Sequence, residues 1–127
     1  MIARALLLAT LAVSPACASD VPSGQSVSLH EVLIDEREDA TWLRFRFLAP
    51  QIGSGDGNIG YDVAGQDMLH LCDTLALTYI EDFELPGDRI VISLMDRVTE
   101  FAVADPDATQ YFEAFRPVDG SCMWDEF

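Results

Sequence analysis

Hydrophobic and polar residues alternate most clearly between Ala40 and Leu48. A repeat of two residues is that of a β-strand, and a similar segment, Val27 to Ile34, lies just before it across a charged turn at residues 35–39. We therefore expect an antiparallel hairpin. The core face of its second strand should hold Leu43, Phe45 and Phe47. The opposite face should hold Trp42, Arg44 and Arg46.

A helical repeat begins at Asp62, the candidate N-cap, and extends to Tyr79. Its apolar positions recur at Met68, Cys72, Leu75 and Tyr79. Its polar positions cluster on the opposite side at Gln66, Asp67, His70 and Asp73. Because one side is apolar, this helix is expected to lie on a sheet.

The run Arg89 to Met95 is almost continuously apolar, which suits a strand at the centre of a sheet. Val98 to Val103 follows after the short connection Asp96-Arg97. This pattern predicts a second hairpin, which Asp105-Pro106-Asp107 then ends.

The segment Ala108 to Arg116 fits two structures. Asp105 as a cap and Pro106 in the first turn suit a helix. Asp119-Gly120, however, is a strong hairpin signal between this segment and Ser121 to Phe127, and we choose the hairpin. Together these patterns predict a small single α+β domain, in which an antiparallel sheet of hairpins packs on one main α-helix.

The first 18 residues have the features of a secretory signal peptide. Arg4 precedes an apolar run, Ala5 to Val13, that is too short to span a bilayer, and Ala16-Cys17-Ala18 is a small-x-small cleavage site. Cleavage after Ala18 would release residues 19–127 into the periplasm or the medium, with residues 19–26 as a flexible lead-in. The alternative is a lipid anchor at Cys17, although the bulky aliphatic residue usual three positions upstream is missing.

Loss of Cys17 with the signal peptide would leave two cysteines, Cys72 and Cys122. Two cysteines allow one intrachain disulfide, and an oxidising compartment favours that bond over two free thiols. The bridge would tie the middle of the helix to the C-terminal strand.

The chain is strongly acidic, with a formal charge of −15. Without Arg4 the exported part keeps 6 arginines against 22 acids, so its charge is 6 − 22 = −16. Such a charge argues against binding to nucleic acids and to anionic membrane surfaces. It suits a cation or a basic exported protein as partner, although most acidic surfaces are simply solvated.

The strand face of Trp42, Arg44 and Arg46 allows two interpretations. An indole beside two guanidinium groups could recognise an anionic or aromatic group. The same arginines could instead pair across the hairpin with His30, Glu31 or Asp35, with Trp42 covering the hairpin, and we favour this pairing because acids are abundant there.

A calcium site is a second hypothesis. Residues with oxygen ligands fall at positions 1, 3, 7 and 12 of an EF-hand-length loop, namely Asp56, Asn58, Asp62 and Asp67. The match is incomplete, because position 6 is Tyr61 rather than glycine and no helix enters the loop. No other metal and no organic cofactor is expected.

The two histidines are the remaining candidates for chemistry. His70 and Asp73 lie one helical turn apart, and His30 adjoins Glu31. Either histidine could serve a small periplasmic hydrolase, but no nucleophile signature accompanies them. We therefore lean against an enzyme.

Several segments resemble a family of short exported proteins of unknown function from alphaproteobacteria related to Rhodobacter. The resemblance covers almost all of the exported chain and is carried by Val21-Pro22-Ser23-Gly24-Gln25, Trp42-Leu43-Arg44-Phe45-Arg46-Phe47, Asp67-Met68, Leu71-Cys72, Ile90-Val91-Ile92-Ser93-Leu94 and Asp119-Gly120-Ser121-Cys122-Met123-Trp124. It implies no catalytic residues. The function predicted from the sequence is therefore a non-enzymatic binding or envelope-associated module.

Overall fold

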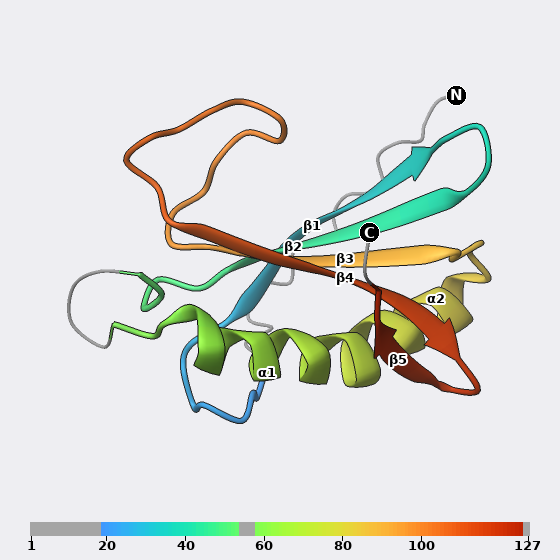
Figure 1. The fold of residues 1–127 in the computed structure, drawn as a ribbon, viewed down its shortest axis with the longest axis horizontal. Coiled ribbons are helices and arrows are strands. Elements are labelled where there is room, and N and C mark those ends of the chain that lie inside the picture. The colour runs from blue at the N-terminus through green and yellow to red at the C-terminus, as the bar shows by residue number, and fades with distance from the viewer. Residues whose placement is uncertain (1–18, 54–57, 126–127) are drawn as a thin grey trace.

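The computed structural model describes residues 19–53 and 58–125, which form one five-stranded sheet covered on one face by a single helical segment (Figure 1). The strands are β1 (Ser28–Glu36), β2 (Thr41–Leu48), β3 (Arg89–Met95), β4 (Gln110–Val118) and β5 (Ser121–Trp124). The helical segment consists of α1 (Tyr61–Leu71), the π-helical turn η3 (Cys72–Ala76) and α2 (Leu77–Phe83). The small α+β domain predicted from the sequence is confirmed.

The strands lie in sheet order β1-β2-β3-β4-β5, and one pair among them is parallel. β2 and β3 run parallel in register, with Phe45 opposite Ile92, whereas the other three pairs are antiparallel. The expected antiparallel sheet is therefore confirmed for three pairs and was wrong at the pair of β2 and β3. The helix is the reason, because it crosses the sheet between β2 and β3 and returns the chain to the end where β2 began.

Hairpins form at both ends of the sheet, as predicted. β1 and β2 pair across the charged turn, with Val32 opposite Phe45. β4 and β5 pair across Asp119 and Gly120, whose φ angles of 52° and 83° are those that a two-residue hairpin turn requires. The segment 108–116 is thus mostly strand, and its alternative as a helix is wrong.

The predicted strand from Val98 to Val103 does not form. β3 pairs instead with β4, and residues 96–109 form a long loop between them. A two-residue hairpin needs positive φ angles, which Asp96-Arg97 does not supply. The apolar residues of this segment also have nothing to bury against, since Val98 and Val103 remain about half exposed.

The helix begins one residue earlier and ends four residues later than expected. Gly60 occupies the N-cap position without a side-chain hydrogen bond, so the prediction of Asp62 as the cap was wrong. Asp62 lies in the first turn, where its negative charge still complements the helix dipole.

The hydrophobic core lies between the helix and one face of the sheet. Leu43, Phe45 and Phe47 are fully buried, as the alternation predicted. They pack with side chains from the helix and the neighbouring strands, including Met68, Leu71, Ile90, Ile92, Leu94 and Phe115.

A disulfide joins Cys72 to Cys122, which confirms the predicted bridge. It links the first residue of the π-helical turn to β5, and Figure 1 shows β5 bent down onto the helix. A π-helical turn inserts one extra residue, which moves the following side chains around the helix axis. Here the turn leaves Cys72 and Ala76 buried, while Asp73 bonds to the backbone of β5.

The lead-in predicted to be flexible packs against the helix. Val21 and Gln25 are buried, and the carboxylate of Asp67 accepts hydrogen bonds from the Ser23 N–H (2.9 Å), the Ser23 hydroxyl (2.6 Å) and the Gln25 amide (2.7 Å). Asp67 was expected on the polar side of the helix, and it is instead fully buried. It fastens the lead-in to the domain.

Candidate functional site

The sheet face opposite the helix, called the open face below, gathers most of the positive charge. Because side chains alternate along a strand, the residues that share a face with Arg44 include Val91 on β3 and Ala114 on β4, which are its register partners. Arg46, Ser93 and Phe112 form the next row. With Arg37 in the adjoining turn, the face holds five of the six arginines that follow Arg4, namely Arg37, Arg44, Arg46, Arg89 and Arg116.

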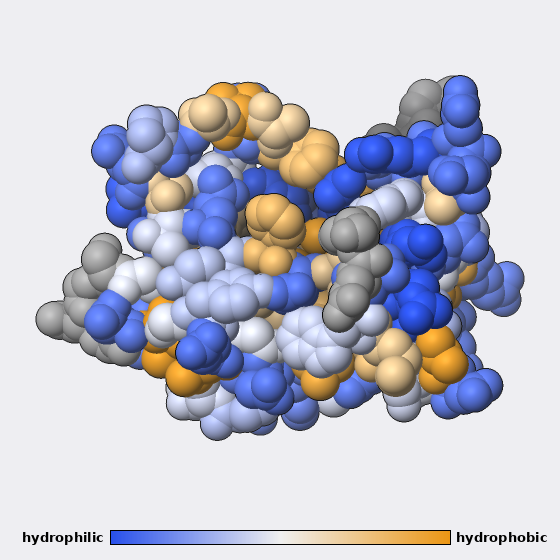
Figure 2. Space-filling model, in the orientation of Figure 1, coloured by the Kyte–Doolittle hydropathy of each residue, from blue (hydrophilic) through white to orange (hydrophobic). Residues whose placement is uncertain are grey.

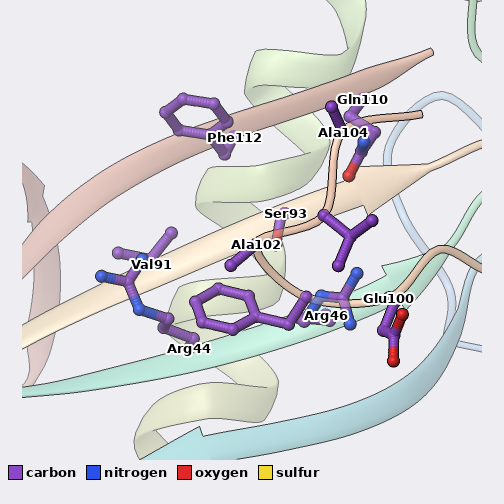
Figure 3. Close-up of a pocket in the computed structure, with 11 residues that line it drawn as sticks. Arg44, Arg46, Val91, Ser93, Glu100, Ala102, Ala104, Gln110 and Phe112 are labelled. Carbon is purple, nitrogen blue, oxygen red and sulfur yellow. The ribbon is translucent and has the colours of Figure 1, made fainter. Parts of the chain in front are cut away.

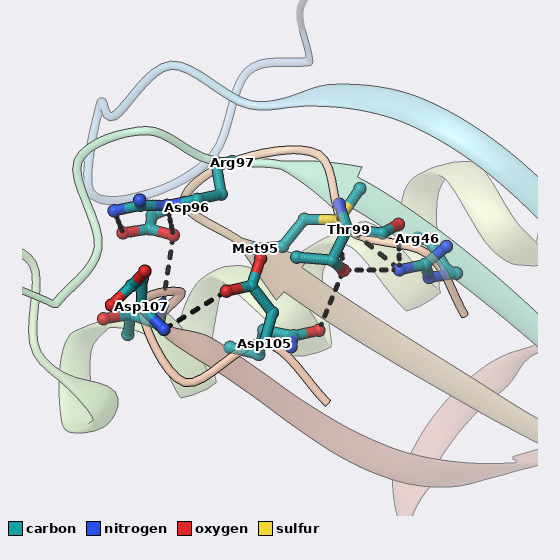
Figure 4. Close-up of polar contacts among 9 residues, drawn as sticks. Arg46, Met95, Asp96, Arg97, Thr99, Asp105 and Asp107 are labelled. Atoms are coloured by element: carbon teal, nitrogen blue, oxygen red, sulfur yellow. Dashed lines mark hydrogen bonds and ion pairs between the residues drawn. The ribbon is translucent and has the colours of Figure 1, made fainter. Parts of the chain in front are cut away.

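The loop 96–109 lies over the open face and is anchored where its two ends meet and at Thr99 (Figure 4). Asp96 joins the two ends, because its N–H donates to the Thr109 carbonyl and its carboxylate accepts the Thr109 N–H, both at 3.0 Å. Near the start of the loop, the buried Arg46 donates to the carbonyl and to the hydroxyl of Thr99, each at 2.9 Å. The loop is therefore held at a defined position above the strands.

A cavity of about 340 Å³ lies between the loop and the sheet. Its floor is formed by Arg44, Arg46, Val91, Ser93 and Phe112, and its wall by loop residues from Glu100 to Ala104. Figure 3 shows Arg44 at one end of this cavity and Glu100 at the other end beyond Arg46, with Phe112 across β3 from Arg44. In Figure 2, hydrophobic surface gathers on the loop and in the hollow beneath it.

Aromatic rings and guanidinium groups alternate along this site. The Trp42 ring lies between Arg37 (5.4 Å) and Arg44 (5.6 Å), measured from the guanidinium carbon to the ring centre. The Phe101 ring lies in the same way between Arg44 (5.4 Å) and Arg46 (5.7 Å). Cation–π contacts at these distances attract each guanidinium to the face of a ring, so the positive groups lie beside apolar surface.

The arginines also pair with carboxylates, as the favoured interpretation predicted. Arg46 forms an ion pair with Glu31, and Arg44 with Asp35 at 3.1 Å. Asp35 accepts from Arg37 as well, and these two guanidinium groups hold the pKa of Asp35 below its ordinary value of 3.8. Because two arginines share one carboxylate, the pairing leaves part of the positive charge unbalanced.

The aromatic residues of the site were not predicted as such. Phe101 was assigned to a strand, and Phe112 was one of several aromatic residues in an ambiguous segment. Both rings remain exposed, at 45% and 66%. Their spacing is that of ordinary core residues, so only the position of the loop over the sheet identifies them as part of a site.

The residues of the predicted calcium site do not come together in the described part of the chain. Asp56 lies outside the described residues, Asn58 and Asp62 are exposed, and Asp67 is buried with its own hydrogen bonds. Within residues 19–53 and 58–125, no three His, Cys, Asp or Glu side chains are placed to hold a metal ion. The calcium hypothesis stays a prediction.

The two histidines line different hollows, and neither lines the cavity described above, although the hollow of His30 shares Glu100 and Phe101 with it. His30 lines a shallower hollow between β1 and the loop, and His70 lines a groove along the helix. In the described part of the chain neither imidazole forms a hydrogen bond or an ion pair. No nucleophile and base are therefore joined there.

The described helices are all too short or too polar to cross a bilayer.

A model described as a family of unknown function (DUF6497) matches residues 4–127. No curated protein and no solved structure matches the chain.

Proposed function

The chain belongs to the family of unknown function DUF6497, and we propose that it is a non-enzymatic binding module whose site is the cavity between the open face and the loop 96–109. This proposal keeps the function predicted from the sequence and adds a location. It also moves the emphasis from Trp42 and the two arginines alone to the rings that the loop and β4 bring beside them.

One observation carries the proposal. Phe101 and Phe112 are large apolar side chains left exposed on either side of a cavity that also holds Arg44 and Arg46. Single exposed apolar residues are ordinary, but several that converge on one cavity with a few polar groups are typical of a ligand site. The volume is at the small end of the range for such sites.

The backbone of the loop supports the same interpretation. Ala102 has a φ of 65°, although it is neither glycine nor asparagine. A residue in this region costs on the order of 1–2 kcal/mol, and such strain tends to cluster where a ligand is bound. Loops of this length without helix or strand are uncommon in small domains unless they serve a function.

The proposal places the module outside the cytoplasm, after removal of residues 1–18 and with the disulfide intact. The features that support this location are the apolar N-terminal segment and the small-x-small cleavage site. Capture of a basic exported protein by the acidic surface remains a further prediction from the charge of −16 derived above.

The experiment is a titration followed by two-dimensional amide nuclear magnetic resonance. Phenol, benzylamine and phenylacetate are added in turn to the disulfide-bonded protein, so that the charge of the probe does not decide the outcome. We expect the shifts to concentrate on Val91, Ser93 and Ala102, and Phe112→Ser to abolish them. Phe83→Ser is the matched control, because Phe83 is about as exposed (62%) but lies on the helix. Shifts that spread over the surface, or that avoid the cavity, would refute the proposal.

A further inference from the structure

We infer that the cavity takes a small monocarboxylate with a planar apolar body, whose carboxylate binds the guanidinium of Arg44. The inference rests on the proposed function and adds to it the chemical class of the ligand. It is drawn from the hydrogen bonds of Arg44, from the charge on the open face, and from the walls of the cavity.

Arg44 is the group in the cavity best placed to bind an anion. Its Nε and Nη2 donate to Asp35 at 3.3 Å and 3.1 Å, and its side chain is only 17% exposed. Among the described residues Nη1 has no acceptor, so this edge of the fork is available to a ligand. In Arg46, in contrast, both terminal nitrogens already donate: Nη1 to Glu31, and Nη2 to Met95 and Thr99.

The position of the guanidinium is fixed before any ligand arrives. It lies between the rings of Trp42 and Phe101, and Asp35 holds its other edge. A charged donor that is already oriented and partly removed from water loses little entropy on binding. Hydrogen bonds from such a donor to a carboxylate are among the stronger ones in proteins.

The balance of charge favours an anion with a single charge. Five arginines lie on the open face, and three carboxylates bond to them, namely Glu31, Asp35 and Asp125. Glu100 on the cavity wall adds a fourth negative charge, which leaves 5 − 4 = +1. This excess is small, and the chain as a whole is strongly negative, so a doubly charged anion such as a phosphate monoester would be repelled.

Apart from Ser93, Glu100 and Gln110, the remaining lining of the cavity is apolar and suits a planar group. Val91 lies beneath it, and Phe112 and Phe101 present exposed rings from β4 and from the loop. Arg44 on β2 and Phe112 on β4 lie on opposite sides of β3 (Figure 3), so a ligand with its carboxylate at Arg44 extends its ring across Val91 toward Phe112. Aromatic rings pack well in such positions.

The test uses three probes of nearly equal size and different charge: phenylacetate, phenylacetamide and 2-phenylethylamine. Dissociation constants are measured from the amide shifts of Val91 and Ala102. We expect phenylacetate to bind about tenfold more tightly than the amide, since one hydrogen bond to a charged group is at stake. The amine should bind most weakly.

Two variants separate Arg44 from the general field of the open face. Each variant removes one of two arginines that share a carboxylate. In Arg44→Met, Arg37 still pairs with Asp35. In Arg116→Met, Arg89 still pairs with Asp125. We expect Arg44→Met to weaken phenylacetate about tenfold and to leave the amide unchanged, while Arg116→Met alters neither by more than about twofold. Should Arg44→Met not fold, Arg44→Lys keeps the charge, loses the fork, and should still weaken phenylacetate severalfold.

The outcomes distinguish this inference from the proposed function. Equal binding of all three probes in the cavity, or tightest binding of the amine, would refute the inference that the ligand is a carboxylate. The proposal that the cavity is a binding site would still hold. An equal loss in Arg44→Met and Arg116→Met would show a long-range field rather than a site at Arg44, and would overturn the inference as well. Absence of any probe from the cavity would overturn both.

Discussion

The carboxylate of Asp73 accepts a hydrogen bond from the backbone N–H of Cys122 at 2.8 Å, directly beside the disulfide that joins Cys72 to the same residue. The helix and β5 are therefore joined twice, once covalently and once by a charged acceptor. We expect Asp73→Ala to lower the free energy of unfolding by about 1–2 kcal/mol, because it leaves the Cys122 N–H without this partner. Urea denaturation measures the loss, and Asp82→Ala, which removes an exposed acid of α2, should change almost nothing.

The disulfide itself contributes more. It closes a loop with a sequence separation of 50, for which the loss of chain entropy in the unfolded state corresponds to about 4 kcal/mol. Replacing both cysteines by serine should lower the urea midpoint accordingly, and reduction of the natural protein should have the same effect. A reduced protein as stable as the oxidised one would contradict this prediction.

Asp67 should be essential for the ordered lead-in. Asp67→Asn keeps one acceptor oxygen and replaces the other by a donor, which then faces Ser23 or Gln25 donors. We expect a loss of about 2–3 kcal/mol and much faster hydrogen exchange at the Ser23 amide. Asp62→Asn, at an exposed position on the same helix, is the control. Unchanged exchange at Ser23 would show that the lead-in is held by other contacts.

The buried role of Asp67 illustrates what the sequence does not reveal. On a helical wheel it lies among Gln66, His70 and Asp73, and an acid in such company is usually solvated. The partners that bury it, Ser23 and Gln25, lie more than 40 residues away in a polar segment that has no periodicity. Nothing local marks that segment as part of the core.

The strands, in contrast, could be predicted where the hydrophobic alternation and the turn residues agreed. Alternation placed Leu43, Phe45 and Phe47 in the core, and Asp119-Gly120 marked the last turn by its need for positive φ. The parallel pair was missed because the hairpins at each end suggested an antiparallel sheet throughout. A strand, a helix and a strand in succession are the usual signature of a parallel crossover.

The candidate site could be predicted only in part. Alternation did place Trp42, Arg44 and Arg46 on one face, and the pairing of both arginines with nearby acids was the favoured interpretation. The cavity, however, depends on the loop 96–109. The apolar pattern of Val98 to Val103 predicted a strand there instead of a loop, because exposed apolar residues and buried ones give the same sequence pattern.

Calcium is expected to leave the stability of the protein unchanged. Asp67, the last ligand of the predicted site, is already fully hydrogen-bonded by the lead-in, and binding a metal would require breaking those contacts. The melting temperature should therefore be the same in millimolar calcium and in chelator. A melting temperature that rises with calcium in the natural protein, but not in Asp67→Asn, would contradict this prediction and support the calcium site.

The contribution of Glu113 to the free energy of unfolding should be smaller at neutral pH than at mildly acidic pH. It lies opposite Ile92 on the helix side of the sheet, and burial raises its pKa above the ordinary value of 4.5. The folded state thus holds this proton more tightly than the unfolded state. The contribution of the neutral form is fully present below pH 4.5 and is lost as the pH rises through the raised pKa.

Glu113→Gln removes the partly buried charge while it keeps the shape, so we expect the melting temperature at pH 7 to rise by roughly 1–3 °C. The difference should vanish near pH 4, where Glu113 is largely protonated.

Asp96→Asn is a control of opposite sign. Arg97, with a further contribution from the Thr109 N–H, lowers the pKa of Asp96 below 3.8, so its stabilisation is present above that pH and lost below it. Asp96→Asn should therefore lower the melting temperature at pH 7. A Glu113→Gln variant that is less stable than the natural protein at pH 7 would mean that the charged form has a partner, and that burial does not govern this residue.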